Sequence, residues 1–366
     1  MTGGWMTGRR LCGRRTLAAA ACCGLRGANA LELPRRNAQV PRRAAHRALL
    51  SSAAAVAAPW AAGAAVAADE SYKWGRDSGA LLERLYDPAA QTYLPPVVQR
   101  VARLRNANIV IVGESHSNPL HHGIELRVLE AVAESRESRN VALGLECFYR
   151  QHQSALDRFV FQGGTLSDLA KETRWSSISG YPLANWAKTL NYAKKAGIRC
   201  VGLNCPIEVT RFVATQGLEN MPPALRQQLG TIDVGDAVHR KAFDDRMNRL
   251  TLGDHASDMT RLYQAECVWE DYMATSAAAF YADAEAAAKK RGEPDFSTKL
   301  VIIAGTGHVD RRGLPGRIHA RLNLAGPPPF TIVPIDVDWD ATELPEVQLP
   351  PTLGSADLIW FTQFEV

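Results

Sequence analysis

The stretch from residue 108 to 132 reads NIVIVGESHSNPLHHGIELRVLEAV, and it places titratable side chains directly behind a strand-like run. The run consists of four β-branched residues at positions 109–112 and leads into Gly113. One carboxylate and three imidazoles follow it: Glu114, His116, His121 and His122. A carboxylate beside imidazoles can transfer protons or bind a divalent metal. Since a simple connecting turn needs no such residues, this stretch is the first candidate for a functional site.

Further polar residues follow other apolar runs. Glu146 closes VALGLE, Asn204 follows VGL, and His308 follows LVIIA in GTGHVDRRGLPGRI. Ligands of open α/β sheets bind outside the carboxyl ends of the strands. We therefore expect Glu114, His116, Glu146 and His308 to share one site, as catalytic residues or as ligands of a divalent metal. Each residue alone has a plainer alternative, since a single His after a strand is often a cap or a loop anchor.

The elements that must position these residues alternate along the chain. Short apolar runs predict strands at residues 109–112, 141–145, 200–203, 300–304 and 330–335. Apolar residues at helical spacing predict helices at 123–137, 151–161 and 183–195, and one or two long helices within 258–290. This order predicts an α/β fold, a mostly parallel sheet flanked by helices, with a helical insertion or subdomain at about 208–290.

The charge of the chain is unevenly distributed. The whole sequence has a formal net charge of +4, but residues 1–68 hold ten Arg, no Lys and a single acid, Glu32. Without them, 32 basic residues stand against 37 acidic ones, a formal net charge of −5. Neutralising a nucleic-acid backbone requires clustered Lys and Arg, so we do not expect nucleic acid as a partner.

Residues 1–68 resemble a bipartite targeting leader, followed by one domain at residues 69–366. An Arg-rich, acid-poor start is typical of transit peptides. Behind it come the twin arginines Arg42 and Arg43, an Ala-rich stretch, and the small-residue pattern Ala65-Val66-Ala67, so the mature chain is predicted to begin near Ala68. We expect delivery to a chloroplast and its thylakoid lumen, with no stable membrane span. The alternative is a disordered Ala/Arg leader without a particular address.

Four of the seven cysteines lie beyond the leader: Cys147, Cys200, Cys205 and Cys267. The spacing of Cys200 and Cys205 allows a disulfide, but a single pair is a weak zinc signal. Buried free thiols are the prediction.

The ordered segments carry a family resemblance. They are GESHSNPLHH, LGLECFYRQHQSALDRFVFQGG, SGYPLANWAKTLNYAKKAGIRCVGLNCP, AECVWEDYMA and IIAGTGHVDRRGLPGRI. In this order they resemble the ChaN-like haem-binding family, in a superfamily with the Tiki/TraB metalloproteases and the erythromycin esterases, over roughly residues 95–340. The resemblance implies an α/β domain with a helical subdomain and haem binding through a tyrosine in a homodimer. Relatives use the G-E-x-H pair for metal-dependent or general-base hydrolysis.

Carried over residue by residue, Glu114 and His116 match the G-E-x-H pair, Glu146 the acid of the second strand, and His308 the G-x-G-H histidine. Tyr181, in the Tyr-Pro segment, is the candidate iron ligand. Its rivals are Tyr149, Tyr192, Tyr263 and Tyr272. AECVWEDYMA departs from the family form, because Glu266 stands where Gln is usual and Glu270-Asp271 inverts the acid pair.

Two functions follow as expectations. In the first, the protein binds haem or a related tetrapyrrole, with Tyr181, His121 and His122 near the ligand and Arg311 meeting a propionate. In the second, it is a hydrolase in which Glu114 or His116 activates water and His308 steadies the oxyanion. No G-x-S-x-G or H-E-x-x-H pattern is present, which excludes the commonest hydrolase classes.

Overall fold

The computed structural model describes residues 84–94, 104, 106–134, 140–250, 258–293, 298–324, 326–337 and 355–363. The predicted leader and its cleavage site lie outside these residues. In the described part of the chain, no helix is both long and apolar enough to span a membrane. All four cysteines beyond the leader are free thiols, and Cys147 is the one that is half-buried rather than buried.

Eight strands of the described chain form one sheet in the order β2-β1-β8-β7-β3-β6-β4-β5. Their bounds are β1 Arg84–Asp87, β2 Thr92–Tyr93, β3 Ile109–Glu114, β4 Asn140–Tyr149, β5 Arg199–Asn204, β6 Thr298–Gly305, β7 Phe330–Val337 and β8 Leu358–Gln363. The strands from β8 to β5 are parallel, whereas β1 pairs antiparallel with β2 and β8. The predicted α/β fold with a mostly parallel sheet is confirmed. The sequence analysis did not predict β1, β2 and β8.

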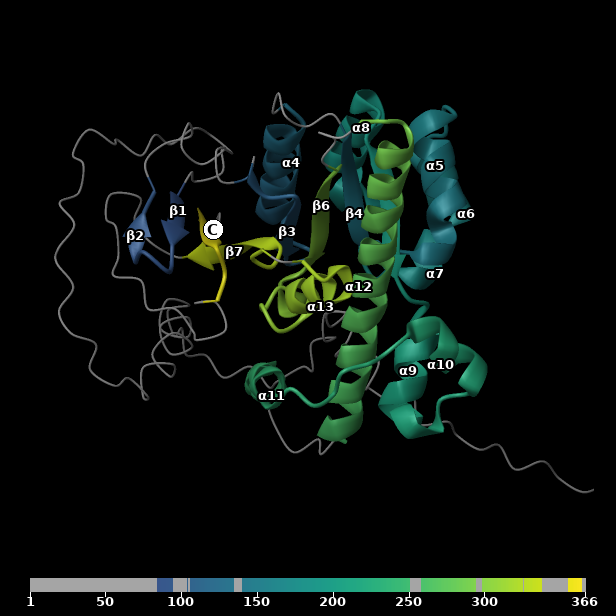
Figure 1. Ribbon diagram of the computed structural model, residues 1–366, viewed down its shortest axis with the longest axis vertical. Coiled ribbons are helices and arrows are strands. Elements are labelled where there is room, and N and C mark those ends of the chain that lie inside the picture. The colour runs from purple at the N-terminus through teal and green to yellow at the C-terminus, as the bar shows by residue number, and fades with distance from the viewer. Residues whose placement is uncertain are drawn as a thin grey trace, which may run out of the picture.

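Helices cover both faces of the sheet (Figure 1). They are α4 Pro119–Ala133, η2 Arg150–His152, α5 Gln153–Phe161, α6 Leu166–Glu172, α7 Trp175–Ile178, η3 Leu183–Trp186, α8 Ala187–Ala196, α9 Ile207–Gln216, η4 Leu218–Asn220, α10 Pro223–Leu229, α11 Ala237–Leu250, α12 Met259–Lys290, η5 Thr306–His308 and α13 Leu314–Leu322. Because side chains alternate along a strand, Val110 and Val112 pack with α4, α5 and α8, while Ile109 and Ile111 pack with α9, α12 and α13. The sheet is thus buried on both faces, as its unbroken apolar strands require.

Helix α4 begins four residues before the predicted start at 123. Asn118 caps it, its side-chain oxygen accepting a hydrogen bond from the Leu120 backbone N–H at 2.9 Å. Pro119 occupies the first turn, where its missing N–H costs no hydrogen bond. The earlier start places His121 and His122 inside the first turns of the helix.

The interval between β5 and β6 is helical and includes α9, α10, α11 and α12. Helix α12 is one continuous helix of 32 residues, about 48 Å long. Asp258 starts it by accepting hydrogen bonds from the backbone N–H groups of Thr260 and Arg261. Its buried residues pack against the sheet and α13, so the helix forms one wall beside the strand ends (Figure 1).

The end of β4 is irregular. The pairing of β4 with β5 shifts register between Leu145 and Tyr149. A bulge of this kind bends the strand and re-aims its side chains. Gly202 of β5 makes the shift possible, since a Cβ there would lie 2.4 Å from the Tyr149 carbonyl oxygen. Glu146 lies within this bulged end.

Candidate ligand and metal site

Glu114 is the last residue of β3, and only 3% of the residue is exposed. Its Oε1 lies 2.6 Å from His116 Nδ1, so that nitrogen donates to the carboxylate. Its Oε2 accepts from the Trp186 indole N–H at 3.0 Å. Burial alone would raise the pKa of Glu114, but hydrogen bonds from His116 and His122 outweigh it and hold that pKa well below its usual value. Glu114 is therefore ionised and fixes the direction of the His116 ring.

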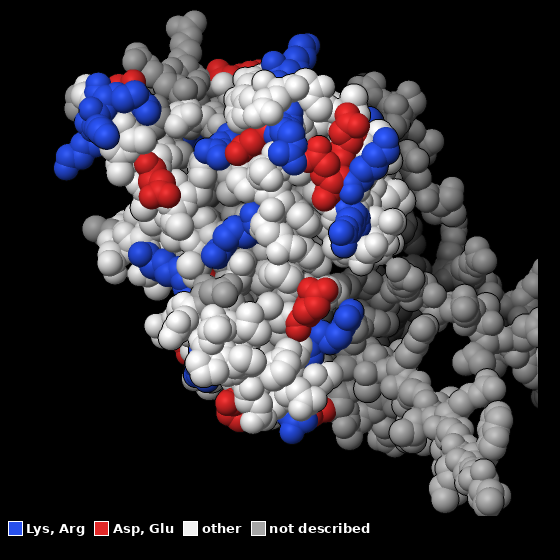
Figure 2. Space-filling view, turned by 90° about the vertical axis from the view of Figure 1, so that its right-hand side faces the viewer, with Lys and Arg blue, Asp and Glu red and all other residues white. Residues whose placement is uncertain are grey.

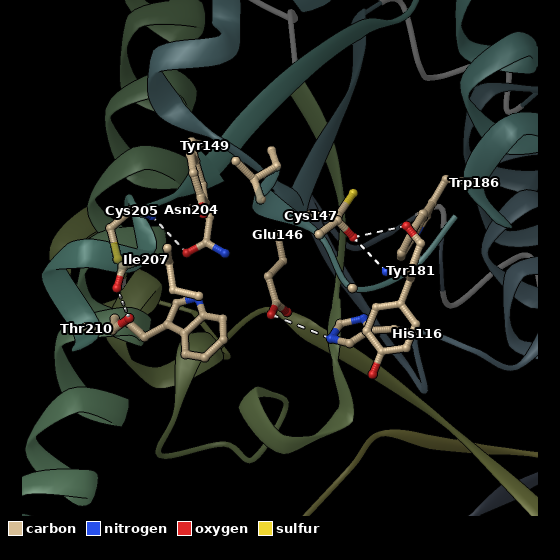
Figure 3. Close-up of a pocket in the computed structure, with 14 residues that line it drawn as sticks. His116, Glu146, Cys147, Tyr149, Tyr181, Trp186, Asn204, Cys205, Ile207 and Thr210 are labelled. Carbon is tan, nitrogen blue, oxygen red and sulfur yellow. Dashed lines mark hydrogen bonds and ion pairs between the residues drawn. The ribbon is translucent and has the colours of Figure 1, made fainter. Parts of the chain in front are cut away.

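Glu146 lies between the imidazoles of His116 and His308. Figure 3 shows its contact with His116. Its Oε2 accepts from the Gly305 backbone N–H at 2.5 Å. Its Oε1 lies 4.0 Å from His116 Nε2 and 3.7 Å from His308 Nε2. A Cβ at Gly305 would lie in van der Waals contact with His116, at 3.4 Å, and with Glu146, at 3.5 Å.

His308 lies in η5 behind β6 and is buried. Its Nδ1 is 3.4 Å from both Glu266 Oε1 and Glu270 Oε1 on α12. Burial lowers the pKa of His308, but Glu266, Glu146 and Glu270 together raise it to about 9. The imidazole is therefore charged at neutral pH. The structure thus brings Glu114, His116, Glu146 and His308 into one continuous group at the carboxyl edge of the sheet.

A hollow opens beside this group, between the strand ends and α12. Its walls are formed by His116, Glu146, Cys147, Tyr149, Ile178, Ser179, Gly180, Tyr181, Trp186, Asn204, Cys205, Ile207, Thr210 and Trp269. Figure 3 shows Tyr181 beside His116, and their ring centroids lie 5.3 Å apart. The backbone of Tyr181 is held in place, because its carbonyl accepts from the Trp175 indole N–H at 2.7 Å.

The tyrosines named as candidate ligands divide into two groups. Tyr181 and Tyr149 line the hollow, whereas Tyr192, Tyr263 and Tyr272 are not among its lining residues. Tyr263 instead bonds to His239 and to the Asp236 carbonyl. The guanidinium of Arg150 covers the ring of Tyr272, 4.0 Å from its centroid.

The remaining predicted ligand contacts lie outside the hollow. His121 accepts from the Ser115 backbone N–H through Nδ1 and contacts Asp336 through Nε2 at 3.2 Å, so it anchors the loop after β3. Arg311 pairs with Asp357 at 2.6 Å and lines a second hollow between α12 and α13. The predicted ligand contacts His121, His122 and Arg311 are thus absent from the described residues that line the hollow.

Comparison with known proteins settles the family. A model of the family described as "Haem-binding uptake, Tiki superfamily, ChaN" matches residues 100–318. The chain belongs to this family. A solved structure titled "Cofacial heme binding to ChaN of Campylobacter jejuni" has the same fold, with a TM-score of 0.54 and 13% identity, covering 76% of this chain and 95% of that one.

Two further proteins are similar to this ChaN-family chain. The Arabidopsis thaliana protein "RETICULATA-RELATED 5, chloroplastic" is 23% identical over 237 residues, 60% of this chain and 30% of that protein. The chain therefore spans less than a third of the length of this plant relative. An erythromycin esterase, EreC, in its open conformation reaches a TM-score of 0.38 at 13% identity, covering 75% of this chain and 81% of its own.

Sequence reasoning missed several groups around this ChaN-family site. Trp186 was placed in a helix without its bond to Glu114. Glu125 lies three residues after His122 on α4, at a spacing that brings the two side chains together. Glu266 and Glu270, whose roles the family comparison left in doubt, are four residues apart on α12 and both face His308. The i, i+3 and i, i+4 spacings were the available signals.

Proposed function

We propose that this protein binds haem in the hollow, with Tyr181 as the donor to iron. The observation that carries the proposal is the place of Tyr181, which lines the hollow next to His116 on a loop whose backbone is anchored by Trp175. A phenolate is a hard anionic donor of the kind that ligates ferric haem iron. Membership of the haem-binding ChaN family supports the same ligand.

The walls of the hollow present aromatic and aliphatic surface of the kind that contacts a porphyrin. Trp269, Trp186 and Tyr149 supply aromatic surfaces, and Ile178 and Ile207 supply aliphatic ones. The described lining contains no Arg or Lys, and Arg311 is engaged elsewhere, so we do not assign a propionate contact to Arg311. When bound, haem would supply a redox-active iron, while the protein would supply the donor, the aromatic walls and the buried carboxylate–imidazole group behind them.

We further propose a homodimer and a plastid location. The hollow is open beside the exposed Gly180, and a second copy of the chain covering this opening would shield a bound ligand from water. The leader pattern and the chloroplast name of the plant relative support delivery to a chloroplast, and the twin arginines favour the thylakoid lumen. N-terminal sequencing of the native protein tests the route, and a mature start before Arg42 would contradict the second signal.

A second candidate function is metal-dependent or general-base hydrolysis. The observation that favours it is the pair of imidazole Nε2 atoms of His116 and His308, which flank Glu146 Oε1. Each ring has carboxylates at its other nitrogen, the arrangement that orients metal-ligating histidines. A divalent ion held by these three residues would supply Lewis acidity. In the general-base alternative no ion is held, and His116 Nε2 would take the proton from the attacking water.

Titration of the purified mature chain with haemin tests the first function. We expect saturable binding with a high-spin ferric spectrum, and we expect Tyr181→Phe to change the spectrum and weaken binding. Tyr192→Phe is the matched control, since Tyr192 is not part of the hollow, and it should leave both unchanged.

Two outcomes would overturn the assignment. An unaltered spectrum and affinity in Tyr181→Phe would transfer the donor role to another residue, with Tyr149 the next candidate in the hollow. Absence of saturable haemin binding, together with ester or peptide hydrolysis that Glu114→Gln abolishes, would replace haem binding by the hydrolase function.

A further inference from the structure

A second cluster of potential ligands lies behind the hollow, between β3 and α4. It consists of Glu114, His122 and Glu125, whose ligand atoms all lie within 4.8 Å of one another. His122 Nδ1 is 3.2 Å from Glu114 Oε2 and 3.0 Å from Glu125 Oε1. The three side chains are buried, and Glu125 is fully so. They form a compact set of one imidazole and two carboxylates beneath the protein surface.

The other nitrogen of His122 determines what faces the carboxylates. His122 Nε2 lies 3.1 Å from the backbone carbonyl oxygen of His116, which can only accept a hydrogen bond. Nε2 therefore carries a proton. Without an ion, Nδ1 donates its own proton to the carboxylates of Glu114 and Glu125, and a metal ion that displaces this proton would meet a lone pair at the same position. Metal-binding histidines commonly donate their second N–H to a backbone carbonyl in this way, which fixes the ligating tautomer.

Glu125 gives an independent sign of a missing partner. Within the described part of the chain, its Oε2 is buried and accepts no hydrogen bond. Neither Glu114 nor Glu125 has an Arg or Lys partner among the described residues, since their contacts are His116, His122, Trp186 and each other's carboxyl groups. A buried carboxylate oxygen without a donor is costly unless it is protonated or coordinates a cation.

We propose that Glu114, His122 and Glu125 form a divalent-metal site, separate from the hollow and independent of haem binding. Mixed nitrogen and oxygen donors suit zinc, ferrous iron or manganese. With metal–ligand bonds of about 2.0–2.2 Å, neighbouring donor atoms lie roughly 2.9–3.4 Å apart. The separations of 3.2 and 3.0 Å at His122 Nδ1 match that range.

In this position, a bound ion would act on His116 through Glu114. Glu114 would bind the ion through Oε2, while its Oε1 keeps its hydrogen bond with His116 Nδ1. The ion would thereby hold Glu114 ionised and fix the orientation of His116 at the wall of the hollow. His122 and Glu125 are positioning residues in this proposal, because neither lines the hollow.

Metal content of the full chain tests the proposal. The protein is incubated with Zn²⁺, freed of loosely bound ion by gel filtration and assayed for zinc per chain, with circular dichroism as the check on folding. We expect an ion that resists gel filtration in the wild type. Glu125→Gln, which is nearly isosteric, and His122→Gln should each weaken binding by more than about 100-fold, since loss of even an outer-shell partner costs about 10–100-fold.

Two sets of controls separate this site from its neighbours. Glu130→Gln on the half-buried side of α4 should retain the ion. Glu146→Gln and His308→Gln should retain it too, and an additional ion lost in these two variants alone would belong to the hydrolase candidate. Retention of zinc in folded Glu125→Gln and His122→Gln would overturn the proposal, as would loss of all zinc in His308→Gln. Absence of tightly held zinc in the wild type would show that Glu125 carries a proton instead. Haemin titration of Glu125→Gln is a separate readout, so failure of the haem proposal leaves this result unaffected.

Discussion

The two clusters of buried carboxylates and imidazoles on either side of the strand ends are compensated in different ways. On α12, Glu270 and Asp271 are bound by Arg317, Asp271 also by Arg321, and Glu266 by Arg246. Behind β3, Glu114 and Glu125 share His122 and have no guanidinium or ammonium partner in the described chain. In the cluster on α12, the acids are neutralised by Arg side chains, whose charge is permanent. In the cluster behind β3, they share His122, an imidazole that can release a proton and bind a metal ion instead.

This difference indicates different tasks. A network of Arg and carboxylates joins α12 to α13 and to the loop before α11, where Arg317 Nη2 donates to the Asp233 carbonyl at 3.0 Å. Removing one member leaves a buried charge without a partner, which is strongly destabilising. The cluster behind β3 contains no Arg or Lys among the described residues. Both acids contact the His122 imidazole, and Glu114 also accepts from the neutral Trp186 indole. We therefore expect the cluster on α12 to stabilise the fold and the cluster behind β3 to exchange a proton for a metal ion.

The largest expected effect is that of Arg317→Met. This substitution keeps much of the side-chain volume but removes the cation between Glu270 and Asp271, so the free energy of unfolding should fall by about 3–5 kcal/mol. Urea denaturation measures the loss.

Arg199→Met is the matched control, because Arg199 forms a largely exposed pair with Asp157 at 2.9 Å. It should cost less than about 1 kcal/mol. Equal costs for the two Arg variants would contradict the structural role of the α12 network. On the side of α5 and α6, basic and acidic side chains are interspersed (Figure 2), which is the setting of such weak surface pairs.

A smaller loss is expected from Trp186→Phe. The aromatic ring is kept, but Glu114 loses the indole N–H that lies 3.0 Å from its Oε2. A hydrogen bond to a charged group contributes about 1.5–3 kcal/mol, and the unfolding free energy should fall by that amount in metal-free protein. Trp175→Phe, which removes a bond to a neutral carbonyl, should cost less. The reverse order would show that Glu114 does not depend on a neutral donor.

The smallest effect concerns pH and His239, which is buried in the α12 cluster. Burial lowers its pKa, but Cys267 and Glu270 raise it to about 10. The Tyr263 hydroxyl also lies 3.2 Å from His239 Nδ1, and Arg317 binds Glu270. Above pH 6.5 the unfolded imidazole is neutral while the folded one keeps its proton, so stability should fall as pH rises from 6.5 towards 10.

The contribution of His239 is at most about 1.4 kcal/mol per pH unit. Denaturation midpoints at pH 7.5 and 8.5 measure it, and His239→Gln should show a shallower decline than the wild type. Parallel declines in the two proteins would assign the pH dependence to other groups.

The sequence predicted the central strands because each is an uninterrupted apolar run buried on both faces. The five predicted runs correspond to β3, β4, β5, β6 and β7. It did not predict β1, β2 or β8, since β1 and β2 span four and two residues and lack a run long enough to show a period. Strand β8 follows residues that carry no crossover pattern. These strands depend on long-range pairing, β8 with β7, β1 with β8 and β2 with β1, which is not visible locally.

The site residues that come directly after a strand were predictable. Glu114, Glu146 and His308 were found because parallel strands end at one edge of the sheet. Glu125, Glu266 and Trp186 were missed because helices deliver them, and the direction of a helix relative to the sheet is set by packing. The contacts of Arg311 with Asp357 could not be anticipated either, since 46 residues separate the pair.

The strand order also has a practical consequence for handling this molecule. The carboxylate–imidazole group sits at the ends of β3, β6 and β4, whereas β1 lies five strands away from β4. Neighbouring strands are about 4.8 Å apart, which separates β1 from β4 by roughly 24 Å. A fluorophore or tether attached at the turn between β1 and β2 would therefore leave the hollow accessible, and that turn is the natural place for a reporter of ligand uptake.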